Sequence, residues 1–155
     1  MSPSSAQIGR CGELLVQYQL LLRGIETAPL STDAGIDLVA YSSKAKRAQT
    51  IQVKANLKPK PGGGAGSAML DWWIPDINPA ELVALVDLSE QARVWIFTRP
   101  EIEEFSQQHS KRGFHIYMYT DPTHKAKSSE RRMYVHEFDE FLLENRIQAL
   151  FGSEF

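Results

Sequence analysis

The spacing of the apolar residues changes after Gly24, and this change limits the folds open to the chain. Before it, apolar residues recur at intervals of three and four, which predicts one stripe of a helix from about residue 7 to residue 23. The stripe consists of Ile8, Cys11, Leu15, Tyr18 and Leu22. After Gly24, the apolar residues come in short alternating or continuous runs bounded by turn-forming residues, which is typical of strands. A helix followed by such strands predicts an α/β fold.

The predicted helix is expected to be largely buried against a sheet. Leu14 and Leu21 widen its apolar face. Cys11 is the chain's one cysteine, and its place on the apolar stripe favours a packed thiol over a reactive one. Glu13 and Gln17 lie off the stripe, one turn apart, on a different face of the helix.

Seven segments have the composition and length of strands. They cover residues 25–28, 36–41, 50–55, 69–74, 82–88, 93–98 and 114–120. The runs at 69–74, 82–88 and 93–98 are expected to complete one sheet core. Thr98 as a cap, followed by Pro100 and Glu101, predicts a short helix to about Gln108. Apolar residues at 138–151 indicate a closing helix, so we expect a mixed sheet flanked by helices.

Length and composition favour a single domain. The chain has 155 residues, of which 43% are hydrophobic and 23% charged, enough for one core and few for two. We therefore expect one domain over residues 1–155, with a flexible start at 1–7 and loops at 58–67 and 121–132. The 58–67 loop is rich in proline and glycine, but it lacks the Lys-Ser/Thr ending of a phosphate-binding P-loop.

Charge and compartment narrow the function classes. A formal net charge of -2 argues against coating of nucleic acid by bulk electrostatics. Local basic groups in predicted loops are expected either to contact DNA phosphates or to be solvated surface; the five residues proposed for DNA contact are Lys44, Lys46, Arg47, Lys58 and Lys60. A single cysteine, no secretory signal and no membrane-length apolar run together predict a cytoplasmic protein that does not enter a membrane.

Two predicted strands carry residues suited to metal-assisted hydrolysis. Asp37 lies in the first and Gln52-Val53-Lys54 in the second. Side chains two apart on a strand point to the same side, so Gln52 and Lys54 are expected to project together. Magnesium prefers oxygen ligands, which the Asp37 carboxylate, the Gln52 amide and a backbone carbonyl near Val53 could supply. Lys54 could then orient a water molecule and offset charge on a phosphate.

These residues give the chain a resemblance to the PD-(D/E)xK nuclease superfamily. In that family a helical glutamate precedes a strand aspartate, which precedes a strand with Glu-x-Lys or Asp-x-Lys; Glu13, Asp37 and Gln52-Val53-Lys54 have this order. The resemblance implies a restriction-endonuclease-like fold and a Mg2+- or Mn2+-dependent endonuclease acting on DNA, often as a homodimer. It also implies that Asp37 is the central metal ligand, Gln52 a second ligand and Glu13 an outer or second-metal ligand. Lys54 would be the catalytic base or water-orienting group.

The chain departs from the family pattern at two positions. Ile36 stands where the motif has proline. Gln52 replaces the usual acid, which removes a negative charge and should weaken metal binding. Some members with glutamine at this place, including certain homing endonucleases, look like working nucleases. A fold that has lost catalysis with this acid and only binds DNA or a protein is therefore the main alternative, and an α/β interaction domain is a third.

Each candidate residue also has an ordinary structural role open to it. Asp37 could cap a turn, Lys54 could be an exposed strand lysine, and Glu13 a solvent-facing helical acid. The four histidines show no zinc-ligand spacing. The tryptophans at 72, 73 and 95 are expected in the core, although the segment 71–73 could border the groove.

Overall fold

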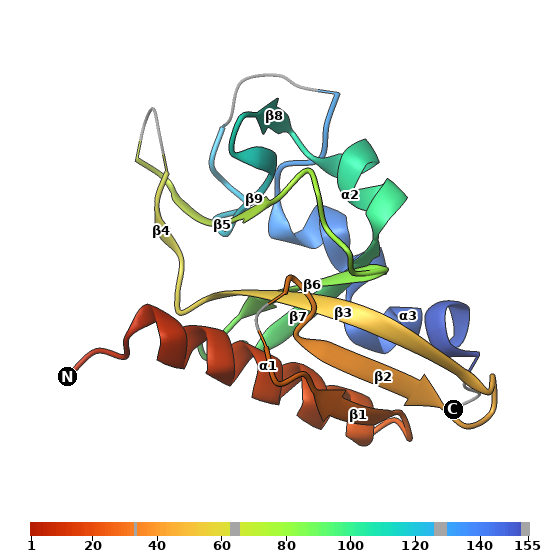
Figure 1. The fold of residues 1–155 in the computed structure, drawn as a ribbon. Helices are drawn as coiled ribbons and strands as arrows, with labels where there is room; N and C mark the ends of the chain where they lie inside the picture. The colour runs from red at the N-terminus through yellow and green to blue at the C-terminus, as the bar shows by residue number, and fades with distance from the viewer. Residues whose placement is uncertain (33, 63–65, 126–129, 153–155) are drawn as a thin grey trace.

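A five-stranded mixed sheet forms the centre of the molecule (Figure 1). The structure is a computed structural model, and it describes residues 1–32, 34–62, 66–125 and 130–152. The strands lie in the order β1-β2-β3-β6-β7. β3 and β6 run parallel, and the other neighbours are antiparallel. Their bounds are β1 Glu26–Pro29, β2 Leu38–Ser42, β3 Arg47–Asn56, β6 Leu82–Asp87 and β7 Arg93–Thr98.

A second, antiparallel sheet packs over one face of the first, on the upper side in Figure 1. Its strand order is β4-β5-β9-β8, with β4 at Lys60–Pro61, β5 at Ala68–Ile74, β8 at Gln108–Ser110 and β9 at Gly113–Tyr119. Both predicted strands at 69–74 and 114–120 exist, but they pair with each other. The expectation that 69–74 would complete the central sheet is therefore wrong.

Two hydrophobic cores, one on each face of the central sheet, explain this arrangement. On β6, Leu82, Ala84 and Val86 point into the core under the helices, whereas Val83 and Leu85 point into the core under the second sheet. All six residues of β6 are buried. A strand covered on both faces reads as a continuous apolar run, and the second sheet supplies the cover on one side.

The first helix, α1 (Ser5–Leu21), packs along β3 through a narrower stripe than predicted. A capping box between Ser4 and Gln7 starts it, so the predicted flexible segment 1–7 is already helical from Ser5. Its buried residues are Gly12, Val16 and Leu20. A Cβ at Gly12 would lie 2.7 Å from the Cβ of Ala55, so this glycine allows the helix to approach the strand closely.

Several residues of the predicted apolar stripe are exposed because the contact with the sheet is centred on Gly12. Leu14, Tyr18, Leu21 and Leu22 are all exposed. Cys11 is exposed as well, so the expectation of a packed thiol is wrong. The spacing of three and four identified the helix correctly but placed its buried face about one residue out of register.

The remaining helices confirm the α/β class. Thr98 and Glu101 form a capping box at α2 (Arg99–Phe105), which ends earlier than predicted because the chain enters β8. The closing helix is divided into a 3-10 helix, η1 (Val135–Phe141), and α3 (Leu143–Phe151). The predicted loops at 58–67 and 121–132 include residues 63–65 and 126–129, which lie outside the described residues. Within the described residues, none of the helices has the length and apolar content needed to cross a membrane.

Candidate functional site

Asp37 is held at the junction of β2 and β3. It immediately precedes β2, and its backbone N–H donates to the carbonyl of Ile51 at 2.9 Å. Its carboxylate accepts a hydrogen bond from the backbone N–H of Val53 at 2.7 Å. These two contacts fix Asp37 against the segment that the sequence singled out, Gln52-Val53-Lys54.

Glu13 reaches Asp37 from α1. The two carboxylates line one pocket of about 420 Å³ together with Arg10 and Val53. Arg10 lies 3.2 Å from Glu13. Burial raises the pKa of Glu13, and the negative charge of Asp37 raises it further, against the opposing effect of Arg10. Within the described part of the chain, two carboxylates therefore line one pocket with a single basic side chain, Arg10, to offset their negative charge.

Glu13→Gln is expected to stabilise the metal-free protein at neutral pH. Since the pKa of Glu13 is raised on folding, the folded chain holds this proton more tightly than the unfolded chain. The stability contributed by this group is therefore lost as pH rises from the ordinary glutamate value through the folded value. The melting temperature of the variant should exceed that of the wild type at pH 7 in chelator, and the two should converge near pH 4. Equal melting curves at both pH values would contradict the charge repulsion.

Lys54 lines a neighbouring pocket of about 450 Å³. Gly9 and Val53 line both pockets, so the two are adjacent. Lys58, Lys60 and Asp71 also line the second pocket. Lys54 therefore lies next to the carboxylate pair, and Lys58 and Lys60 line the same pocket as Lys54.

Gln52 does not line either pocket. The residue is 8% exposed, and its amide oxygen accepts a hydrogen bond from Asn78 at 2.6 Å. Asn78 is itself fixed, because its own side-chain oxygen accepts from the backbone N–H of Ala80. The structure therefore brings Glu13, Asp37 and Val53 to one pocket and Lys54 to the next, and holds the Gln52 side chain in a separate, partly buried hydrogen bond.

The donor set at the first pocket suits a hard cation only in part. Among the described residues, no group of three His, Cys, Asp or Glu side chains is close enough to hold a metal ion. A cation bound here would be held by the carboxylates of Glu13 and Asp37 and would need further oxygen ligands from the backbone or water. Magnesium commonly binds proteins in this way, through one or two carboxylates and several waters.

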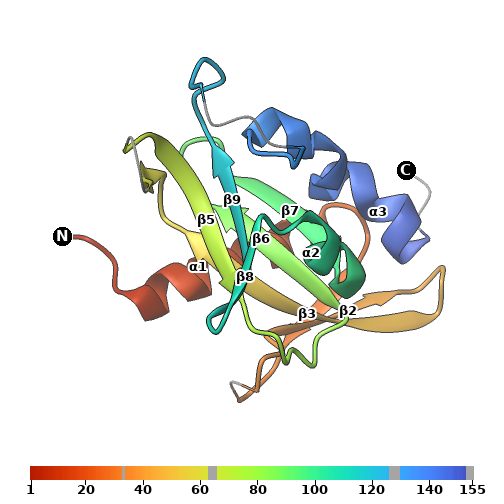
Figure 2. The same cartoon turned by 90° about the horizontal axis from the view of Figure 1, so that it is seen from above.

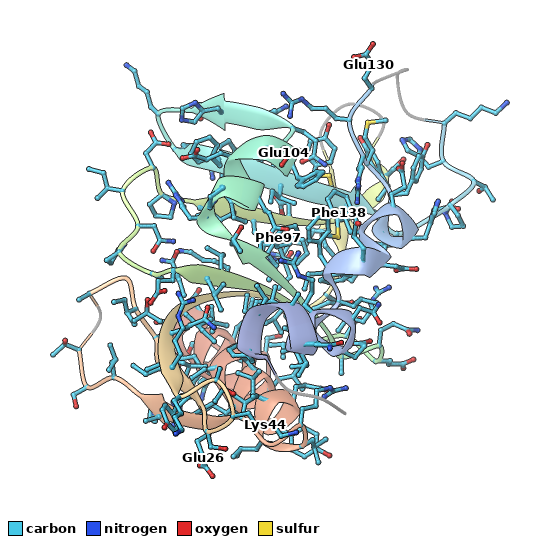
Figure 3. All side chains as sticks on the ribbon, turned by 90° about the vertical axis from the view of Figure 1, so that its right-hand side faces the viewer. Glu26, Lys44, Phe97, Glu104, Glu130 and Phe138 are labelled. Carbon is cyan, nitrogen blue, oxygen red and sulfur yellow. The ribbon has the colours of Figure 1, made fainter. Side chains whose placement is uncertain are left out.

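The predicted DNA-contacting residues fall at two separate places. Lys58 and Lys60 line the pocket beside Lys54. Lys44, Lys46 and Arg47 lie in or beside the turn between β2 and β3, at the end of β2 opposite Asp37; Figure 3 shows Lys44 at this edge, far from the second sheet. Arg47 is paired with Glu81 at 3.0 Å.

Sequence reasoning did not single out Arg10, and it named Asp71 only as part of a segment, 71–73, that could border the groove. Arg10 is one turn before Glu13, and this spacing could have indicated the ion pair. Asp71 reaches the Lys54 pocket because β5 crosses next to β3, where the Asn56 amide donates to the backbone carbonyl of Asp71 at 2.8 Å. The specific contact between Asn56 and Asp71 has no local sequence signal, since it depends on the position of the second sheet.

Comparison with known proteins supports the fold and does not test the chemistry of the site. No protein-family model and no curated protein sequence matches the chain. Among solved structures, the chain is similar to a bacterial homing endonuclease, I-Ssp6803I, with 11% sequence identity and a TM-score of 0.61. The alignment covers 98% of this chain and 100% of that one. The chain therefore shares a nuclease-like α/β fold, and its assignment to the PD-(D/E)xK superfamily stays a prediction.

Proposed function

We propose that the chain is a metal-dependent deoxyribonuclease that hydrolyses DNA phosphodiester bonds. The observation that carries the proposal is the meeting of Glu13, Asp37 and Val53 in one pocket, with Lys54 in the next. These residues were selected from the sequence for their order along the chain, and they come from α1, from the residue before β2 and from β3. The likeness to a homing endonuclease fold is consistent with this function.

Each residue has a separate role in the proposed reaction. Glu13 and Asp37 would hold magnesium or manganese, which would relieve the unbalanced charge in their pocket. When bound, such a cation polarises a phosphate and lowers the pKa of its water. Lys54 would orient the attacking water and offset the negative charge that develops on the phosphate. Gln52 would position the strand through Asn78 and need not be a ligand.

A plasmid-nicking assay tests the proposal. Purified protein is incubated with supercoiled plasmid in magnesium, manganese or chelator. The wild type should nick the plasmid only with metal, and Lys54→Ala should lower the rate roughly 100-fold, since removal of one charge-stabilising donor commonly has this effect. Lys111→Ala, an exposed lysine in the β8–β9 turn, is the matched control. Nicking that persists in chelator, or that survives in Lys54→Ala, would contradict the proposal.

Lys58 and Lys60 are expected to bind phosphates more strongly than the lysines of the β2–β3 turn. Each phosphate contact contributes about 0.9 to the slope of log affinity against log salt. Lys58→Ala with Lys60→Ala should therefore reduce the slope by roughly 2, measured by duplex DNA binding in chelator. Lys44→Ala with Lys46→Ala should reduce it less, because that turn lies at the far end of β2. A larger reduction of the slope in the Lys44/Lys46 variant would mean that DNA binds at the β2–β3 hairpin instead.

The position of Gln52 favours one alternative, a fold that binds DNA without cleaving it. An uncharged side chain bonded to Asn78 adds no negative charge to the carboxylate pocket. Magnesium titration distinguishes the two functions. A nuclease should gain thermal stability from magnesium through Asp37, and this gain should be lost in Asp37→Asn. A folded protein that binds DNA but shows no response to magnesium would support the alternative.

A further inference from the structure

In Figure 2, no described helix lies over the outer face of the second sheet. This face carries polar and aromatic residues. On β5, Leu70, Trp72 and Ile74 point into the core, so Asp71 and Trp73 point outward. On β9, Ile116 and Met118 point inward, so the odd-numbered positions point outward. Antiparallel pairing sets Trp73 opposite His115 and Asp71 opposite Tyr117.

Four of these outward residues form a continuous row, which we call the aromatic row: Trp73, His115, Tyr117 and Tyr119. The Trp73 and His115 rings are parallel, with centroids 4.1 Å apart. Tyr117 lies 5.4 Å from His115 and 5.7 Å from Tyr119. Trp73, Tyr117 and Tyr119 are half-buried. His115 is buried and stacks on Trp73, so the surface of the aromatic row is formed by Trp73, Tyr117 and Tyr119.

The aromatic row lies among positive charges. The Arg112 guanidinium lies 4.3 Å from the centroid of the Trp73 ring. The Asp71 carboxylate lies 2.9 Å from the Nε2 atom of His115. The His115 hydrogen bond lowers the pKa of Asp71, and the charges of Lys60 and Arg112 lower it further, in spite of burial. The carboxylate is therefore already matched by positive partners, and the face suits an anionic ligand with flat rings.

The aromatic row also continues from the candidate site. Asp71 precedes Trp73 by two residues on β5, and together with Lys60 it lines the Lys54 pocket. That pocket adjoins the one that holds Glu13 and Asp37. A polynucleotide leaving the carboxylate pair along the basic side would pass Lys54 and Lys60 and then reach Trp73.

We propose that the outer face of β5 and β9 binds unpaired bases of a single DNA strand next to the cleaved bond. The observation behind it is the aromatic row flanked by Lys60 and Arg112 and joined to the Lys54 pocket. Unpaired bases stack on aromatic side chains, while positive groups hold the backbone. This inference rests on the proposed nuclease function, and it names the substrate class as DNA with a single-stranded segment.

Binding without cleavage tests this inference. Fluorescence anisotropy in chelator compares three probes: a single-stranded oligonucleotide, an abasic strand of equal length, and a blunt duplex. The wild type should prefer the single strand that carries bases to the abasic strand. Trp73→Ala and Tyr117→Ala should each weaken binding of that strand at least fivefold and leave the abasic strand nearly unaffected. Tyr18→Ala removes an exposed tyrosine from α1 and is the matched control.

The conservative variant Trp73→Phe guards against misfolding. It keeps a flat ring, so it should retain most of the preference for bases, and thermal melts would show whether each variant is folded. Equal affinity of the wild type for abasic and base-containing strands would overturn the inference, as would a Trp73→Ala loss shared by all three probes. If base-dependent binding is found while no DNA is cut in metal, the nuclease function fails and the binding face stands. If Lys54-dependent nicking is found with no base preference, the nuclease function stands and the proposed binding face fails.

Discussion

Asp37→Asn is expected to lower metal-dependent DNA cleavage by roughly three orders of magnitude. A bound cation contributes several kcal/mol of transition-state stabilisation, and each 1.36 kcal/mol corresponds to a factor of about ten in rate. Asp37 is the carboxylate fixed most firmly beside β3, through its contacts with Ile51 and Val53. Removal of its charge leaves Glu13 as the single carboxylate in the pocket. The rate is measured as initial nicking of supercoiled plasmid over a magnesium titration.

The asparagine substitution separates charge from structure. The amide oxygen of asparagine can still accept the hydrogen bond from the Val53 N–H, so the β2–β3 junction should keep its form. Asp139→Asn makes the same change at an exposed carboxylate in η1 and should cleave at the wild-type rate. The variant at position 37 should also lose the rise in melting temperature that magnesium gives the wild type. A folded Asp37→Asn protein with an unchanged nicking rate would refute the assignment of the site.

Local patterns predicted most strands because each is short, apolar and bounded by turn residues. β7 matches its predicted bounds, residues 93–98, and β6 differs by one residue. The buried face of α1 was less predictable. Its stripe is set by Gly12, where the absence of a side chain lets the helix touch Ala55. A glycine does not count as an apolar residue in a periodicity analysis. The predicted stripe was therefore placed on the larger apolar residues near Gly12, several of which are exposed.

The candidate site was predictable in its parts and unpredictable in its arrangement. Residues close together on one hairpin could be joined from sequence, since Asp37 precedes a strand that pairs with β3. Gln52 and Lys54 were expected to project to the same side because they are two residues apart on one strand. The partner of the Gln52 amide, Asn78, lies 26 residues further along and could not be predicted from the strand itself. Asp71 and the aromatic row depend on the second sheet, whose position no local pattern encodes.

Phe97→Ala is expected to destabilise the protein by about 3–5 kcal/mol, the usual cost of removing a large aromatic side chain from a core. Phe97 is fully buried on β7, and its ring stacks on Phe141 at 4.5 Å and lies 6.5 Å from Phe138; Figure 3 shows Phe97 and Phe138 in the middle of the molecule. This ring joins the central sheet to η1. Since a domain is typically stable by only about 5–15 kcal/mol, the loss would be a large fraction of the total.

Urea unfolding measures this loss of stability. Two further variants separate the effect of core packing from other effects. Phe97→Leu refills much of the space and should cost clearly less than Phe97→Ala. Ile77→Ala removes an apolar side chain that is 91% exposed and should change the free energy of unfolding by less than about 0.5 kcal/mol. The central sheet owes one of its two covered faces to the core around Phe97. A cost below about 1 kcal/mol for Phe97→Ala would mean that the second sheet and η1 do not form a packed core with β7.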